Sequence, residues 1–253
     1  MLNLYLYKYN RFIKKVEKRF KVSFFFLSIF RIFLIIIEKI YFKKINFNHI
    51  KKYSNYYLKD NLFSQKNDII SAGIANENSF EQTIYKKLKI NKMICIDPTD
   101  IAESTMRNIQ SENVHFIKSA IYDKIEDIKI YEPFSKNNHN LSIDNLYESK
   151  NFKFIKTTTI EDIMKKFDLK KLDIVKLDIE GVADKVITSM IKKEIYPSQI
   201  AFEIERPMSL FRQIEFFKRT FVLINILKDK YNLYSYTKLK LGFRIEILAT
   251  LKN

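Results

Sequence analysis

Residues 173–181 read Asp-Ile-Val-Lys-Leu-Asp-Ile-Glu-Gly, a short apolar run that passes into two carboxylates and a glycine. The run Asp173–Asp178 has the length and β-branched content of a buried strand, and Val182–Lys192 has the apolar spacing of a helix. Short apolar runs and helical periods alternate in the same way from Asp68 onward. This alternation is typical of an α/β fold with a mostly parallel sheet.

The pattern places five strands and five helices in this region. The expected strands are 68–72, 93–97, 114–118, 173–178 and 199–205, and the expected helices are 79–88, 101–109, 160–167, 182–192 and 208–228. A short extra strand is expected at 129–134, followed by a polar loop at 135–150. Residues 231–237 and 243–251 alternate around Gly242, which predicts a C-terminal antiparallel hairpin.

Composition divides the chain near residue 60. The 253 residues suit one α/β domain with an extension. The formal charge is +16, and residues 1–60 hold 14 Lys and Arg against three acids. We expect a basic, hydrophobic and helical extension over residues 1–60, and a separate α/β domain over residues 61–253.

The extension has the composition of a membrane-surface helix. Basic residues between Lys8 and Lys44 surround an apolar run, Val22–Ile37, which Arg31 interrupts. The run is short of the about 20 residues that a spanning helix needs, and no signal-peptide cleavage site follows it. A helix lying on an anionic membrane through residues 8–44 fits best. A buried or oligomer-forming helix and a spanning helix are the alternatives.

Two of the three glycines, Gly73 and Gly181, follow expected strands, where the ligands of open α/β sheets bind. The alternative is that each glycine only allows the chain to turn after the strand and has no role in ligand binding. The loop Gly73–Asn78 lacks the other glycines of a dinucleotide-binding loop, and Glu77 disfavours a phosphate and suits a cation. A nicotinamide dehydrogenase is therefore the least favoured class.

S-adenosylmethionine carries an ammonium, a sulfonium and a ribose diol, and no phosphate. Asp97 ends the second expected strand, where a carboxylate can accept hydrogen bonds from a ribose diol. The competing role for Asp97 is to cap the helix that follows Pro98.

Four segments together resemble the FkbM-type methyltransferase family: residues 71–81 (SAGIANENSFE), 96–100 (IDPTD), 118–124 (KSAIYDK) and 173–187 (DIVKLDIEGVADKVI). The resemblance covers about residues 66 to 206. It implies a class I, Rossmann-like methyltransferase fold that uses S-adenosylmethionine, usually to methylate a hydroxyl of a sugar or other natural product. Many bacterial members act in the biosynthesis of surface polysaccharides.

The resemblance also implies roles for single residues. It places Gly73, Ala75 and Glu77 in the methyl-donor loop, Asp97 at the ribose, and Ser119 and Ala120 near the adenine. Asp178, Glu180 and Gly181 fall at the reaction side of the sheet. The chain departs from the family where Ala75 replaces a glycine, where Asn76-Glu77 replaces an acidic pair, and where Asp100 replaces a proline.

Methyl transfer to a neutral hydroxyl benefits from a general base near the acceptor. Asp178 and Glu180 are the first candidates, and strand alternation would turn both to one side with Ile179 opposite. His139 in the polar loop is the alternative base. Asp178 could instead only orient the donor, and Glu203 is a possible acceptor ligand. Two carboxylates alone give little support for Mg²⁺, so no metal is assigned.

These observations predict a cytoplasmic O-methyltransferase, peripheral at the inner membrane face, whose acceptor is a small molecule or a glycan. A non-catalytic, membrane-associated homologue is the second class, since Ala75 could crowd the donor. A nucleic-acid methyltransferase is the third, disfavoured because the basic residues lie away from the motifs. The single cysteine, Cys95, excludes a disulfide framework.

Overall fold

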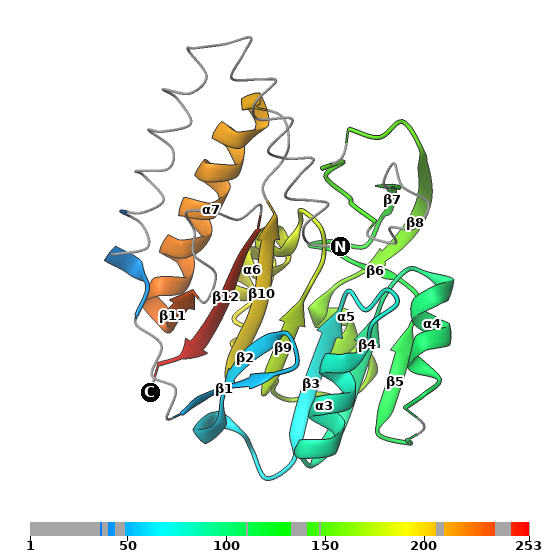
Figure 1. Cartoon of the computed structure of the whole chain (residues 1–253), viewed down its shortest axis with the longest axis vertical. Helices are drawn as coiled ribbons and strands as arrows, with labels where there is room; N and C mark the ends of the chain where they lie inside the picture. The colour runs from blue at the N-terminus through cyan, green and yellow to red at the C-terminus, as the bar shows by residue number, and fades with distance from the viewer. Residues whose placement is uncertain are drawn as a thin grey trace.

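A computed structural model describes residues 36, 40–43, 49–109, 111–132, 141–146, 148–205, 210–235 and 244–252 (Figure 1). Its centre is a sheet of seven strands. In chain order they are β3 (Asn67–Ala72), β4 (Ile90–Ile96), β5 (Val114–Ile117), β9 (Ile174–Leu177), β10 (Gln199–Glu205), β11 (Tyr231–Ser235) and β12 (Arg244–Leu251). Within the sheet they lie in the order β11-β12-β10-β9-β3-β4-β5.

The sheet confirms the predicted fold class. Strands β3, β4, β5, β9 and β10 run parallel, and β12 lies antiparallel between β10 and β11. This is the strand order of the class I methyltransferase fold, with the expected antiparallel C-terminal pair. Gly242 lies outside the described residues. The chain builds outward from β3 to β5 and then returns to β9, so the topological switch point lies between β3 and β9.

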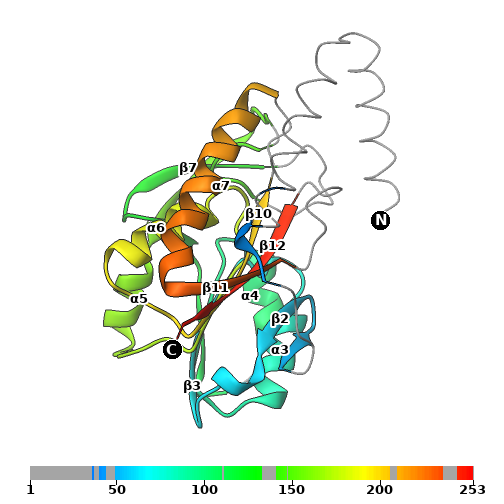
Figure 2. The same cartoon turned by 90° about the vertical axis from the view of Figure 1, so that its left-hand side faces the viewer.

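Five helices cover the two faces of the sheet: α3 (Ser79–Lys87), α4 (Asp100–Met106), α5 (Ile160–Lys166), α6 (Ala183–Lys192) and α7 (Leu210–Lys230). Apolar side chains of α5, α6 and α7 form one buried core against the sheet, and those of α3 and α4 form another. Figure 2 shows the two groups of helices on opposite sides of the sheet. Because both faces are covered, most side chains of the central strands are buried and apolar, and the buried polar ones, such as Lys176 and Glu203, are exceptions.

Residues 50–59 correct the prediction of a purely helical extension. They form an antiparallel hairpin of β1 (Ile50–Tyr53) and β2 (Tyr56–Lys59), followed by the 3-10 turn η1 (Asp60–Leu62). Its buried side chains pack in the same core as Phe80 and Ile84 of α3. The hairpin is therefore part of the α/β unit, because its apolar face is buried against that unit.

A smaller sheet lies beside the end of β5. It consists of β6 (Ala120–Ile121), β7 (Asp127–Tyr131) and β8 (Phe152–Thr158) in the order β6-β8-β7. The extra strand expected at 129–134 corresponds to β7 and begins two residues earlier. No strand was predicted at β8.

Most of the extension lies outside the described residues, so its predicted membrane role stays a prediction. At its described end, the ring of Tyr41 contacts Phe221 of α7 edge-on, and Phe42 forms a β-bridge with Leu233. Among the described residues, no helix combines the length and hydropathy needed to cross a bilayer.

Candidate active site

A cavity of about 180 Å³ opens at the carboxyl ends of β3, β4 and β9. This is the edge at which open α/β sheets bind ligands. Eight predicted site residues line it: Gly73, Ala75, Glu77, Asp97, Ser119, Ala120, Asp178 and Glu180. Gly181 and Glu203 are not part of this lining, and His139 lies outside the described residues. The structure thus gathers residues that are more than a hundred positions apart in the sequence into one site.

Gly73 lies where the loop after β3 meets the loop after β9. Its φ is +80°, and a Cβ added there would lie 1.7 Å from the carbonyl oxygen of Asp178. Its own N–H donates to the Ile96 carbonyl at 3.0 Å. The loops after β3 and β9 therefore touch, and only a residue without a side chain can occupy this point.

Ala75 also has a left-handed backbone, with φ of +49°. An alanine pays roughly 1–2 kcal/mol for this conformation, which glycine adopts freely. The loop therefore keeps a backbone suited to the missing glycine, at some cost in stability.

We expect Ala75→Gly to raise the free energy of unfolding by about 0.5–1 kcal/mol, because relief of the strain exceeds the extra entropy of the unfolded glycine. Urea denaturation measures this change. Ala102→Gly, within α4, is the matched control and should lose about 1 kcal/mol or more. Equal losses in the two variants would contradict the strain at Ala75.

Asp97 organises the loop after β3. Its side chain is 5% exposed. Its Oδ2 accepts the N–H groups of Ile74 at 2.8 Å and Ala75 at 3.0 Å, and its Oδ1 accepts the N–H of Thr99 at 2.9 Å and the Thr99 hydroxyl at 2.5 Å. Thr99, not Asp97, is the N-cap of α4, since its Oγ1 accepts the N–H of Ala102. Asp97 lines the cavity and also holds the donor loop in place.

The β1–β2 hairpin clamps the other end of this loop. Asn55 donates to the carboxylate of Glu77 at 3.4 Å, and the Ser79 hydroxyl donates to the same oxygen at 2.7 Å. The hydroxyls of Ser54 and Ser79 lie 2.6 Å apart. Asn55 and Tyr56 also line the cavity. Sequence reasoning missed these residues, because it placed them in the extension.

A buried ion pair lies beneath the loop. Lys176 of β9 is 3% exposed, and its ammonium donates to the Gly73 carbonyl. Its Nζ lies 3.9 Å from Oε1 of Glu81, which is fully buried, and 3.7 Å from Oδ2 of Asp178. The Ser71 hydroxyl also donates to Glu81. Burial raises the pKa of the neighbouring Cys95 thiol well above its ordinary value, and the Glu81 charge adds to this.

Asp178 and Glu180 reach the cavity from a loop, not from a strand. β9 ends at Leu177, and Asp178, Ile179 and Glu180 all line the cavity. Ile179 also packs against the buried core formed with α5, α6 and α7, so the expectation that its side chain lies opposite the two carboxylates stays a prediction.

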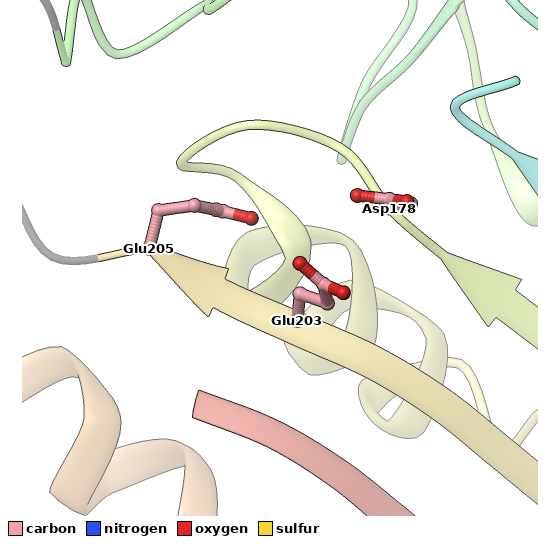
Figure 3. Close-up of side chains that lie close together, drawn as sticks. All are labelled: Asp178, Glu203 and Glu205. Atoms are coloured by element: carbon pink, nitrogen blue, oxygen red, sulfur yellow. The ribbon is translucent and has the colours of Figure 1, made fainter. Parts of the chain in front are cut away.

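Strand β10 adds two carboxylates to this region. Figure 3 shows Glu203 and Glu205 of β10 and Asp178 turned toward one another, and one oxygen of each lies within 4.8 Å of the others. Tyr56 donates to Glu203 at 3.3 Å, and the Gly181 N–H donates to Glu205 at 2.9 Å. Burial raises the pKa of Glu205 well above its ordinary value, and the charge of Glu180 raises it further. The sequence leaves open a surface ion pair of Glu205 with Arg206, whereas Oε1 of Glu205 is buried.

The remaining wall of the cavity comes from residues 119–121 and from a second segment that contributes Leu141 and Ile143. Ser119 donates to the Lys156 carbonyl at 2.8 Å, which fixes its side chain against β8. Arg219 of α7 ties the second segment down, since it pairs with both Asp144 and Asp184. Burial lowers the pKa of Arg219, but these two carboxylates outweigh it and raise the pKa above its ordinary value.

Comparison with known proteins gives likenesses of fold. No family model and no curated protein matches the sequence. The chain is similar to the crystal structure of methyltransferase FkbM from Methylobacillus flagellatus KT, at 16% identity and a TM-score of 0.48, over 74% of this chain and 44% of that one. The chain thus spans less than half the length of that protein.

Two further solved structures are similar over comparable spans. The O-methyltransferase from Bacillus cereus, in complex with S-adenosylhomocysteine, matches at 12% identity and a TM-score of 0.43, over 74% of each chain. The fibrillarin pre-rRNA processing protein of Methanococcus jannaschii matches at 10% identity and a TM-score of 0.42, over 75% of this chain and 68% of that one.

Proposed function

We propose that the protein is an S-adenosylmethionine-dependent O-methyltransferase of the FkbM type, acting on a hydroxyl of a sugar, a glycan or a related natural product. The observation that carries this proposal is the charge of the cavity. Its described lining has five carboxylates, those of Glu77, Glu81, Asp97, Asp178 and Glu180, and one cationic side chain, Lys176. Lys176 is itself bound to the Gly73 carbonyl.

Such a cavity favours a cationic ligand and repels a phosphate. The residues present therefore fit S-adenosylmethionine, which when bound supplies an electrophilic methyl group on a sulfonium. Gly73 and Ala75 would let the loop backbone approach the donor closely. Asp97 would accept hydrogen bonds from the ribose hydroxyls while it keeps its bonds to Ile74 and Ala75. Ser119 and Ala120 would flank the adenine.

Asp178 and Glu180 would bind and deprotonate the acceptor. One of these carboxylates would accept the hydroxyl proton as the acceptor oxygen takes the methyl group that the bound donor would supply. Alignment of the oxygen with the methyl group supplies much of the rate. His139 is the alternative base.

We expect S-adenosylhomocysteine to bind and NAD⁺ to fail to bind, since only the second carries a pyrophosphate. We expect Asp97→Asn to weaken the binding of S-adenosylhomocysteine at least tenfold. The reason is that a neutral amide accepts hydrogen bonds from the ribose hydroxyls less strongly than a carboxylate does. Calorimetric titration measures both, with Asp127→Asn, at an exposed position of β7, as the matched control.

Thermal unfolding shows whether each variant is folded. A folded wild type that binds no S-adenosylhomocysteine would exclude the proposal and favour the non-catalytic homologue. Equal affinity in Asp97→Asn and Asp127→Asn would exclude the ribose assignment.

We also propose that the protein works in the cytoplasm, where S-adenosylmethionine is made, and at the inner membrane face. The support is the basic and apolar composition of residues 8–44. Binding to anionic vesicles that falls steeply with salt is the expected property.

A further inference from the structure

Three carboxylates converge at the edge of the cavity. Asp178 comes from the loop after β9, and Glu203 and Glu205 come from β10, two positions apart and hence on one face of the strand. Figure 3 shows all three side chains directed into one space. Asp178 faces the large cavity, and Glu205 lines a second cavity of about 20 Å³. The three carboxylates therefore include one that lines each cavity.

The distances suit one small cation. The three oxygens lie within 4.8 Å of one another. An ion placed between three such oxygens would lie at most about 2.8 Å from each of them. This distance is close to the about 2.0–2.6 Å at which Mg²⁺ and Ca²⁺ bind oxygen. Small rotations of the side chains would bring the three oxygens to that distance, and water would fill the remaining coordination positions. The strand fixes two of the three ligands, so the site is largely formed before a cation arrives.

A second observation points to a ligand in the same place. Oε1 of Glu205 is buried and has no hydrogen-bond partner among the described residues. The other oxygen, Oε2, accepts the N–H of Gly181 at 2.9 Å. This bond holds the carboxylate in place, and the Glu205 side chain lies toward Asp178 and Glu203 (Figure 3). A buried carboxylate oxygen without a partner is costly, and a cation or a proton removes that cost.

We propose that Asp178, Glu203 and Glu205 bind one hard divalent cation, of the class of Mg²⁺, Mn²⁺ or Ca²⁺. Carboxylate oxygens are the ligands that these ions prefer. The role of the cation, unlike its binding, rests on the proposed function. There it would polarise the acceptor hydroxyl, which leaves Glu180 as the base because Asp178 is occupied.

Titration with Mn²⁺, followed by the electron paramagnetic resonance signal of the free ion, tests this site without any assay of activity. We expect the wild type to bind one Mn²⁺ per chain. Glu205→Gln should bind it at least tenfold more weakly, and Asp178→Asn should show a similar loss. Glu112→Gln, on an exposed turn, is the matched control and should bind within twofold of the wild type.

Thermal unfolding in a chelator checks the fold of each variant. Glu205→Gln should unfold no lower than the wild type, because its amide can donate to Asp178 and Glu203 in place of the cation. A wild type that leaves all Mn²⁺ free, or equal binding by Glu205→Gln and Glu112→Gln, would overturn the cation site. So would binding that occurs only after S-adenosylhomocysteine is added, since the site is formed by the protein alone.

Calorimetry with S-adenosylhomocysteine separates the two proposals. If S-adenosylhomocysteine binds and Mn²⁺ does not, only the cation site is wrong. If Mn²⁺ binds and S-adenosylhomocysteine does not, the proposed function is wrong and the cation site stands.

Discussion

Gly73→Ala is expected to lower the free energy of unfolding by roughly 3–5 kcal/mol, which is at the upper end for single substitutions. Two costs add. The first is the left-handed backbone, with φ of +80°. The second is a steric clash, because the new Cβ would lie 1.7 Å from the carbonyl oxygen of Asp178. That oxygen belongs to the main chain, so the loop after β9 must move as a whole.

Urea denaturation measures this loss, and Gly181→Ala is the matched comparison. Gly181 has nearly the same φ, +84°, but its new Cβ would meet only side chains, the nearest being Asp144 at 3.0 Å. Gly181→Ala should therefore lose about 1–2 kcal/mol, the cost of the backbone alone. Losses of equal size in the two variants would show that the contact between Gly73 and Asp178 does not matter.

Lys176→Met is expected to cost roughly 3–5 kcal/mol, because it leaves the buried carboxylate of Glu81 without its cation. Glu81 is fully buried, and its Oε2 already has no hydrogen-bond partner among the described residues. The substitution also removes the donor to the Gly73 carbonyl. The unpaired charge, rather than the lost packing, should dominate the effect, since methionine fills a similar volume.

The double variant Lys176→Met with Glu81→Gln should recover most of this loss, since no buried charge then remains unpaired. Lys170→Met is the matched control. Lys170 is 84% exposed and pairs with Asp168, which is also exposed, so its removal should cost less than about 1 kcal/mol. A Lys176→Met variant as stable as Lys170→Met, or one that Glu81→Gln fails to rescue, would contradict this account.

The buried centre of the fold could be predicted from the sequence. β9 and β10 are rich in buried Ile, Val, Leu and Phe, so each stands out as a short, mainly apolar run, and β10 has the predicted bounds. The helices α5 and α6 were located for a related reason, because each has one apolar face.

The hairpin and β8 were missed because they are only partly buried. Phe152 and Phe154 of β8 are exposed and alternate with lysines, which hides the usual distinction between an inner and an outer face. In the hairpin, Tyr53 and Tyr56 flank a two-residue turn, Ser54-Asn55, in which Ser54 has a positive φ. This turn is the sequence signal that could have predicted the hairpin. The basic residues around it favoured the assignment of this segment to the helical extension instead.

The candidate site was predicted in part. Loop residues after parallel strands meet at one edge of the sheet, so the positions of Gly73, Asp97 and Asp178 followed from the order of the strands. The partners of Lys176 and the burial of Glu205 could not be predicted. Glu81 lies 95 positions before Lys176, and their contact depends on how α3 packs against the sheet.

The hairpin also decides how far this protein can be trimmed. A chain that starts at residue 61 would expose the faces of Phe80 and Ile84 that Tyr56 and Leu58 now cover, and it would free Glu77 from Asn55. A shortened chain that keeps this packing therefore has to start at or before Ile50. A shortened protein that lacks the proposed membrane-binding segment, residues 8–44, should therefore begin between that segment and Ile50.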